Sequence, residues 1–106
     1  MVLYSPQALD DFDDIFEGLL HWHKIELSDQ FTIDYVDELK KQCESISSMQ
    51  IHLSTTYPDH KRFGKKVHRY RRNLNTTWYI IYDIDDENNI YINKIMSNYL
   101  TVEEQE

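Results

Sequence analysis

The chain has 106 residues, the size of one small domain, and it carries a net charge of −8 at pH 7. Its apolar content of 41% argues against wholesale disorder, and its single cysteine, Cys43, excludes an intrachain disulfide and fits a reducing compartment. No charged leader precedes a long apolar stretch and no apolar run approaches the roughly 20 residues of a membrane span, so we expect one soluble, cytoplasmic domain over residues 1–106, with a frayed tail at about 101–106 and no membrane contact.

The first elements predicted along the chain are a short strand and a long helix. The stretch "VLYS" at 2–5 is apolar enough for an edge strand. Ser5 suits the N-cap of a following helix, and Pro6 suits its first position. Helical spacing then relates Leu9, Phe12, Phe16, Leu19 and His23. This pattern indicates an amphipathic helix whose opposite face is acidic.

A second amphipathic helix is predicted to begin at Ser28 or Asp29. Its apolar positions again follow a spacing of three and four, at Ile33, Val36, Leu39, Cys43 and Ile46. Because the join between the two helices is short, we expect a helical hairpin. Cys43 lies on the apolar stripe, which predicts a small buried side chain rather than a reactive thiol.

Strands dominate the remainder of the chain. The stretch 54–64 contains Pro58 and Gly64 and is predicted to be a loop. Three runs rich in β-forming residues follow, at 65–72, 76–85 and 90–96. Their short polar joins predict an antiparallel meander. Since the helices precede the strands, we expect an α+β domain with the helical hairpin packed on one face of the sheet.

The alternation and the helical stripes together predict a buried core. Its expected members are Leu9, Phe12, Phe16, Leu19, Val36, Leu39, Ile46, Ile80, Tyr82, Ile90 and Ile92. In the last strand, alternation places Ile90 and Ile92 on one face and Ile95 on the other. Trp78, Tyr79 and Tyr82 could stack nucleic-acid bases, but a core position is the stronger interpretation for most of them.

Positive charge is concentrated in one segment of this acidic chain. Seven of the 11 basic residues occupy positions 61–72, with no acid among them. Arg69 and Arg71 share one face of a strand, whereas His68 and Arg72 point to the other face. Three interpretations stay open: a site for an acidic partner, a nucleic-acid contact, or a solvated edge that blocks sheet aggregation. The candidate partner- or nucleic-acid-binding residues are Lys65, Lys66, Arg69, Arg71 and Arg72.

No metal ion or cofactor is expected. His21 and His23 are two positions apart on a helix and therefore do not share a face. No cysteine or acidic residue joins them with the spacing of metal ligands, and the sequence contains no glycine-rich phosphate loop.

The order of elements and several short motifs resemble the RelE/ParE toxin superfamily of bacterial type II toxin–antitoxin modules, over about residues 2–100. "ALDDFDDI" at 8–15 is similar to the family's first helix, "A-L-x-D-L-x-x-I". "WYIIYDID" at 78–85 is similar to a "Y-R-I-x-Y" strand, and "IYINKIM" at 90–96 to a "V-x-I-x-x-I" strand. The resemblance implies the same α+β fold, a growth-inhibiting toxin with a role such as plasmid stabilization, and a cognate antitoxin as partner.

The resemblance also bears on the target. RelE-type members, which cut mRNA on the ribosome, use basic residues on the first meander strand, and Arg69 and Arg71 match those positions. A further family arginine is replaced by Tyr79, and the stretch 97–100 has no basic residue, with Tyr99 as the one candidate for the family's late tyrosine. These departures favour a ParE-like toxin that inhibits DNA gyrase by binding. A ribosome-dependent mRNA endonuclease with Arg69 and Arg71 as weak catalytic candidates, and a degenerate non-toxic binding domain, remain alternatives.

Overall fold

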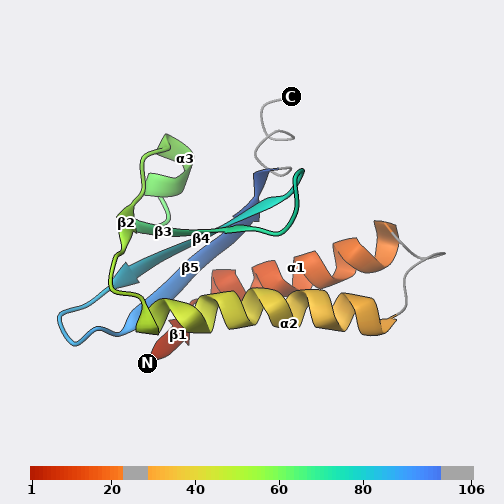
Figure 1. Cartoon of the computed structure of the whole chain (residues 1–106), viewed down its shortest axis with the longest axis horizontal. Helices are drawn as coiled ribbons and strands as arrows, with labels where there is room; N and C mark the ends of the chain where they lie inside the picture. The colour runs from red at the N-terminus through yellow and green to blue at the C-terminus, as the bar shows by residue number, and fades with distance from the viewer. Residues whose placement is uncertain (23–28, 99–106) are drawn as a thin grey trace.

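A computed structural model describes residues 1–22 and 29–98 of the chain. The fold consists of two long helices and a five-stranded sheet (Figure 1). The long helices lie against each other on one side of the sheet. The elements in chain order are β1 (Val2–Tyr4), α1 (Pro6–Trp22), α2 (Asp29–Ser45), η1 (Ile46–Ser48), β2 (Leu53–Ser54), α3 (Pro58–Lys61), β3 (Lys66–Arg71), β4 (Thr77–Ile84) and β5 (Ile90–Ser97). The predicted α+β architecture is confirmed.

The strands are ordered β1-β5-β4-β3-β2 across the sheet. β3, β4 and β5 form the predicted antiparallel meander, and β2 adds an antiparallel edge to β3. β1 pairs in parallel with β5, where Val2 lies opposite Ile90. The predicted N-terminal strand therefore exists, and it neighbours the last strand of the chain.

The start of α1 is held as the sequence predicts. The Ser5 hydroxyl accepts a hydrogen bond from the Ala8 N–H at 3.0 Å, which caps the helix, and Pro6 occupies the first position. Ser5 also donates from its hydroxyl to the Asn93 carbonyl at 3.1 Å and from its N–H to the Ile92 carbonyl at 2.9 Å. These contacts fix the start of α1 beside β5.

The stretch 54–64, predicted as a loop, also contains two short elements. Ser54 belongs to β2, and Pro58 begins α3, whose first turn closes when the Tyr57 carbonyl accepts from the N–H groups of His60 and Lys61 at 3.0 Å each. Gly64 follows, and a Cβ atom there would lie 3.0 Å from the Tyr82 carbonyl oxygen. A glycine at this position lets the chain cross close to β4.

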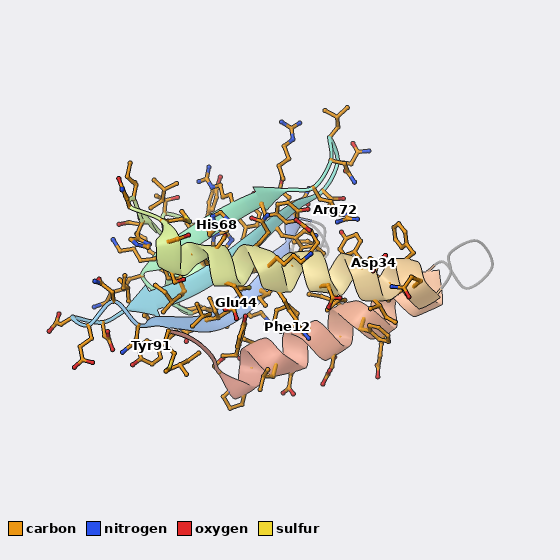
Figure 2. The ribbon with its side chains drawn as sticks, turned by 60° about the horizontal axis from the view of Figure 1, so that its bottom comes forward. Phe12, Asp34, Glu44, His68, Arg72 and Tyr91 are labelled. Carbon is orange, nitrogen blue, oxygen red and sulfur yellow. The ribbon has the colours of Figure 1, made fainter. Side chains whose placement is uncertain are left out.

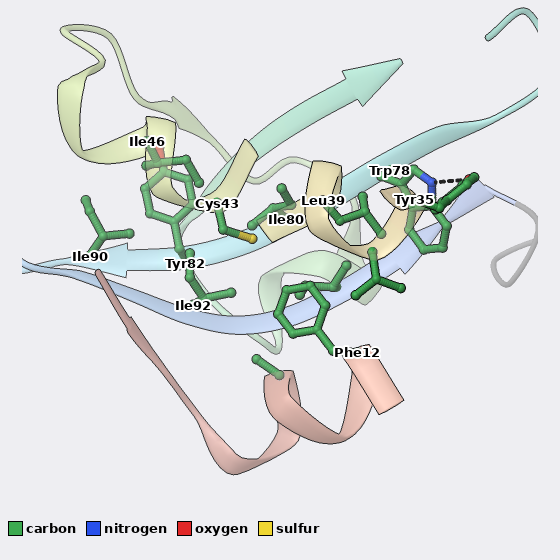
Figure 3. Packing of buried hydrophobic residues seen from close by; sticks show 13 residues of the cluster. Phe12, Tyr35, Leu39, Cys43, Ile46, Trp78, Ile80, Tyr82, Ile90 and Ile92 are labelled. Carbon is green, nitrogen blue, oxygen red and sulfur yellow. Dashed lines mark hydrogen bonds between the residues drawn. The ribbon is translucent and has the colours of Figure 1, made fainter. Parts of the chain in front are cut away.

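The main core lies between the helices and the sheet (Figure 3). Most of the predicted core is buried, namely Phe12, Val36, Leu39, Ile46, Ile80, Tyr82, Ile90 and Ile92. Phe16 and Leu19 are partly buried against it. Cys43 is completely buried, as predicted, and burial raises the pKa of its thiol to about 12, so the reactive thiolate is strongly disfavoured.

Two predictions on the helix stripes are wrong. Leu9 is 52% exposed and Ile33 is 41% exposed. On α1 the buried face includes Ala8 and Asp11, because the Asp11 carboxylate accepts the Ile95 N–H at 2.9 Å and turns that face toward β5. On α2 the buried face includes Thr32, Tyr35 and Val36.

The expected cap at Ser28, the stripe position His23 and the tail at 101–106 lie outside the described residues.

The prediction for Ile95 is also wrong. The pairing of β4 with β5 shifts its register between Ile81 and Tyr82, which is the mark of a β-bulge. The extra residue brings Ile95 onto the same face as Ile90 and Ile92, where it is buried in the main core. A simple two-residue alternation cannot anticipate such an inserted residue.

Candidate partner-binding surface

The face of the sheet turned away from α1 and α2, here called the outer face, carries the charge pair predicted from the sequence. Val67, Ile81 and Met96 form a small second core cluster on this face. Alternation along β3 then places Arg69 and Arg71 on the same side as Val67. Both arginines are exposed. The sequence therefore predicted correctly that they share a face.

The other three candidate binding residues, Arg72, Lys66 and Lys65, make different contacts. Arg72 lies with its guanidinium carbon 3.8 Å from the centre of the Tyr35 ring. Lys66 Nζ is 3.4 Å from Ser54 Oγ. Lys65 is exposed and donates its backbone N–H to Asp83 Oδ1 at 2.9 Å. Of the five candidate binding residues, Lys65, Arg69 and Arg71 are exposed, whereas Lys66 and Arg72 are partly buried.

His68 lies on the helix side, as alternation predicts, and so it cannot assist Arg69 and Arg71. Its Nε2 is 3.0 Å from Gln42 Oε1 on α2 (Figure 2). Burial lowers the pKa of His68, which favours the neutral ring. The contact is a structural link between β3 and α2.

A different histidine, His60, lies beside the exposed pair. Its ring centre is 4.8 Å from that of Tyr79 and 5.2 Å from that of Tyr57, and its side chain is only 3% exposed. Burial lowers the pKa of His60, Asp59 opposes that change, and the positive charge of Arg69 adds to it. His60 therefore holds α3 against the outer face as a neutral, buried ring.

Lys94, unlike Arg69 and Arg71, pairs its positive charge with an acid. Lys94 Nζ lies 3.0 Å from Asp11 Oδ1 and 5.4 Å from the centre of the Phe63 ring. Among residues 1–22 and 29–98 this is the one ion pair within 4.0 Å. Arg69 and Arg71 form no ion pair within 4.0 Å with any of these described residues.

Metal binding has no support in the part of the chain that the structure describes. Within it, no group of three or more histidine, cysteine or acidic side chains could hold a metal ion. His23 lies outside the described residues, and so does Tyr99. No helix among the described residues is both long enough and apolar enough to span a membrane.

Comparison with protein families shows which family this chain belongs to. The family described as the ParE toxin of type II toxin–antitoxin system, parDE, matches residues 2–98. The chain belongs to the ParE toxin family. It is therefore the toxin of a type II toxin–antitoxin module, whose second component is an antitoxin. Comparisons with curated proteins and with solved structures returned no match.

Three features of this ParE-family toxin escaped the sequence analysis. The bond between Asp11 and Lys94 joins residues 83 positions apart, so no local sequence pattern predicts it. His60 falls in a stretch that Pro58 and Gly64 marked as a loop, although a proline followed by an acid and two basic residues is typical of a short helix. Tyr35 was missed because the predicted stripe of α2 began at Ile33, one residue after the buried Thr32, and passed over position 35.

Proposed function

We propose that this ParE-family toxin inhibits growth by binding a protein target such as DNA gyrase, and that its cognate antitoxin neutralises it by covering the outer face. The observation that carries this proposal is the setting of Arg69 and Arg71. They are exposed and have no carboxylate within 4.0 Å among the described residues, and the histidine beside them is buried. Such a pair can hold an anion, and the histidine that lies beside it in the described part of the chain is too buried to transfer a proton to a substrate.

RNA cleavage by attack of a 2′-hydroxyl requires a base to remove that proton and an acid for the leaving group. His60 is 3% exposed, so a substrate cannot reach it. Tyr79 occupies the position of a family arginine and packs its ring on His60. The chemistry at Arg69 and Arg71 therefore suits charge recognition better than cutting.

The charge distribution supports an acidic antitoxin segment on the outer face. The two long helices expose carboxylates on the opposite side of the molecule, at Asp10, Asp13, Asp14, Asp34 and Asp37. An acidic segment is repelled by that layer and attracted by Arg69 and Arg71, which form no ion pair with an acid among residues 1–22 and 29–98. Electrostatic complementarity thus directs the segment to the sheet.

Controlled expression in a bacterial host tests the proposal. We expect growth arrest with DNA damage and trapped gyrase–DNA complexes, while translation continues at first. Co-expression of the antitoxin should restore growth. The proposal requires the toxin to act in the cytoplasm, where DNA gyrase and ribosomes work.

A ribosome-dependent mRNA endonuclease is the second candidate, because Arg69 and Arg71 lie on the sheet face and match basic positions of RelE-type members. Early loss of translation with mRNA cut on stalled ribosomes would establish it in place of gyrase inhibition. We expect purified toxin to leave naked RNA intact. The absence of any growth defect at full expression would instead indicate a degenerate domain that retains antitoxin binding only.

A further inference from the structure

The turn between β3 and β4 presents an apolar side chain to solvent. Leu74 is 86% exposed, more than any other large apolar side chain that the structure describes. It lies within the stretch "RRNLNTT" at 71–77, so its neighbours are arginine, asparagine and threonine. An exposed leucine at the tip of a projecting ribbon has no role in the core of this chain.

Hydrogen bonds hold the turn in one shape. Asn73 Oδ1 accepts from the N–H groups of Asn75 and Thr76, both at 2.9 Å. Asn98, which follows β5, braces the turn from the next strand. Its Oδ1 accepts from the Thr77 N–H and its Nδ2 donates to the Asn75 carbonyl, each at 3.0 Å. Because these hydrogen bonds already order the backbone of the turn, Leu74 would lose little further conformational entropy on binding a partner.

The base of the ribbon is anchored to α2. Arg72 lies over the Tyr35 ring, and the Tyr35 hydroxyl accepts a hydrogen bond from Trp78 Nε1 at 2.9 Å (Figure 3). Figure 2 shows Arg72 beside α2, with the ribbon continuing beyond it. This attachment keeps the tip directed away from the core, so Leu74 stays available.

We propose that Leu74 is a preorganised anchor that enters an apolar pocket with an acidic rim on the target protein. The rim is inferred from charge, since Arg71 beside it is exposed and the sequence has no acid between Asp59 and Asp83. A few side chains that fill water-excluding pockets carry most of the binding energy of protein interfaces. The inference rests on the proposed function in one respect, which is that the toxin acts by binding a protein.

The shape and charge of the tip disfavour the other two partners. A single extended or helical segment of an antitoxin has no concave surface of its own, and so it offers no pocket for a projecting side chain. Nucleic-acid binding draws its affinity from several phosphate contacts. Arg71 is the one exposed cation on this ribbon tip because Arg72 is engaged with Tyr35. A net charge of −8 further opposes a polyanion.

Leu74→Ala is the test variant, and Ile51→Ala is its matched control. Ile51 is 73% exposed and lies next to β2, which pairs with the opposite end of β3. Each is expressed from the same adjustable promoter in the bacterial host, and the protein level at which growth stops is measured. We expect Leu74→Ala to require about tenfold more toxin, the loss typical of an interface anchor, and Ile51→Ala to match the parent chain. Asn73→Ala, which keeps the leucine but frees the turn, should lie between them.

Melting temperature, antitoxin affinity and retention on duplex DNA are measured on the same purified variants. The proposal predicts that Leu74→Ala leaves all three unchanged. Unaltered toxicity of Leu74→Ala, or a loss of antitoxin or DNA binding in its place, would overturn the anchor. Growth arrest without trapped gyrase would overturn only the gyrase assignment, because the anchor is read from arrest itself. A parent chain that arrests no growth would overturn both.

Discussion

The guanidinium carbon of Arg72 lies 3.8 Å from the centre of the Tyr35 ring, and this contact ties the end of β3 to α2. A half-buried cation–π contact contributes about 1–2 kcal/mol. We expect Arg72→Ala to lower the free energy of unfolding in urea by that amount. Arg71→Ala is the control, because Arg71 is exposed and should change stability by less than about 0.5 kcal/mol. Equal effects of the two substitutions would contradict the assignment.

Asp11 joins α1 to the sheet with two bonds, to Lys94 Nζ at 3.0 Å and to the Ile95 N–H at 2.9 Å. The carboxylate is buried, so its removal leaves both donors without their acceptor. Breaking a buried pair in this way costs about 3–5 kcal/mol, and the partial exposure of Lys94 places Asp11→Ala near the lower figure. Asp13→Ala, at an exposed position of the same helix, should be nearly neutral. Thermal unfolding of both variants measures the difference.

Phe12 and Phe16 lie one helical turn apart on α1, but they differ in burial. Phe12 is 5% exposed in the main core, whereas Phe16 packs on its margin. Phe12→Ala should therefore cost about 3–5 kcal/mol, because it removes a buried ring and leaves a cavity. Phe16→Ala should cost about 1–2 kcal/mol, for partial burial. If urea unfolding gave the larger loss for Phe16, the rotation of α1 toward Ala8 and Asp11 would be wrong.

The buried ring of His60 makes stability depend on pH. Its pKa in the folded chain lies below the ordinary 6.5, chiefly through burial, so the unfolded chain binds the proton at higher pH. Stability is then fully present above 6.5 and falls as the pH drops from there toward the folded pKa. His68, whose pKa burial also lowers, acts in the same direction.

Urea unfolding between about pH 7.5 and 5.5 should accordingly show a falling free energy. His60→Gln should flatten this slope in part, and the double change with His68→Gln should flatten it further. A parent chain that gains stability on acidification in this range would refute the expectation.

Arg69 and Arg71 provide the test of the antitoxin site. Reversal of both to glutamate should weaken antitoxin binding by roughly 1.5–3 kcal/mol per contact if the interface buries them, and by about 0–1 if they stay exposed. Added salt should weaken binding in the exposed case, because it screens the charges. The melting temperature should hold, since neither side chain is in the core. Lys40→Glu with Lys41→Glu makes the same charge change at exposed positions of α2, on the other side of the sheet, and serves as control. Unchanged affinity in a folded Arg69–Arg71 variant would exclude the outer face as the antitoxin site.

Much of the fold was predictable because its long elements carry strong periodic signals. The stripes of α1 and α2 and the alternation of β3 and β4 gave the layers, and alternation alone separated Arg69 and Arg71 from His68. The predictions fail where contacts between residues far apart in the sequence determine which side chains are buried. The bond from Asp11 to Ile95 rotates α1 and exposes Leu9, and a bulge in β5 moves Ile95 into the core.

The candidate site was predictable only in part, for a related reason. The positive charge of the basic segment is visible in the sequence, but its division between two faces depends on what each side chain meets. Arg72 contacts the ring of Tyr35, which is 37 positions earlier in the chain. His60 contacts Tyr79 because it lies in α3, a helix of four residues. Short helices and edge strands such as β2 are stabilised by tertiary contacts, so local propensity does not specify them.

The parallel pairing of β1 with β5 has a consequence for the time at which the toxin becomes active. β5 lies between β1 and β4, so β1 has no partner strand in the sheet until the ribosome has synthesised and released the chain through Ser97. Pairings between the first and last strands close slowly because they require a long loop to form. A nascent chain therefore lacks the complete sheet for most of its synthesis. An antitoxin already present in that cell can meet the toxin as it folds, and a chain that terminates before β5 cannot form this sheet.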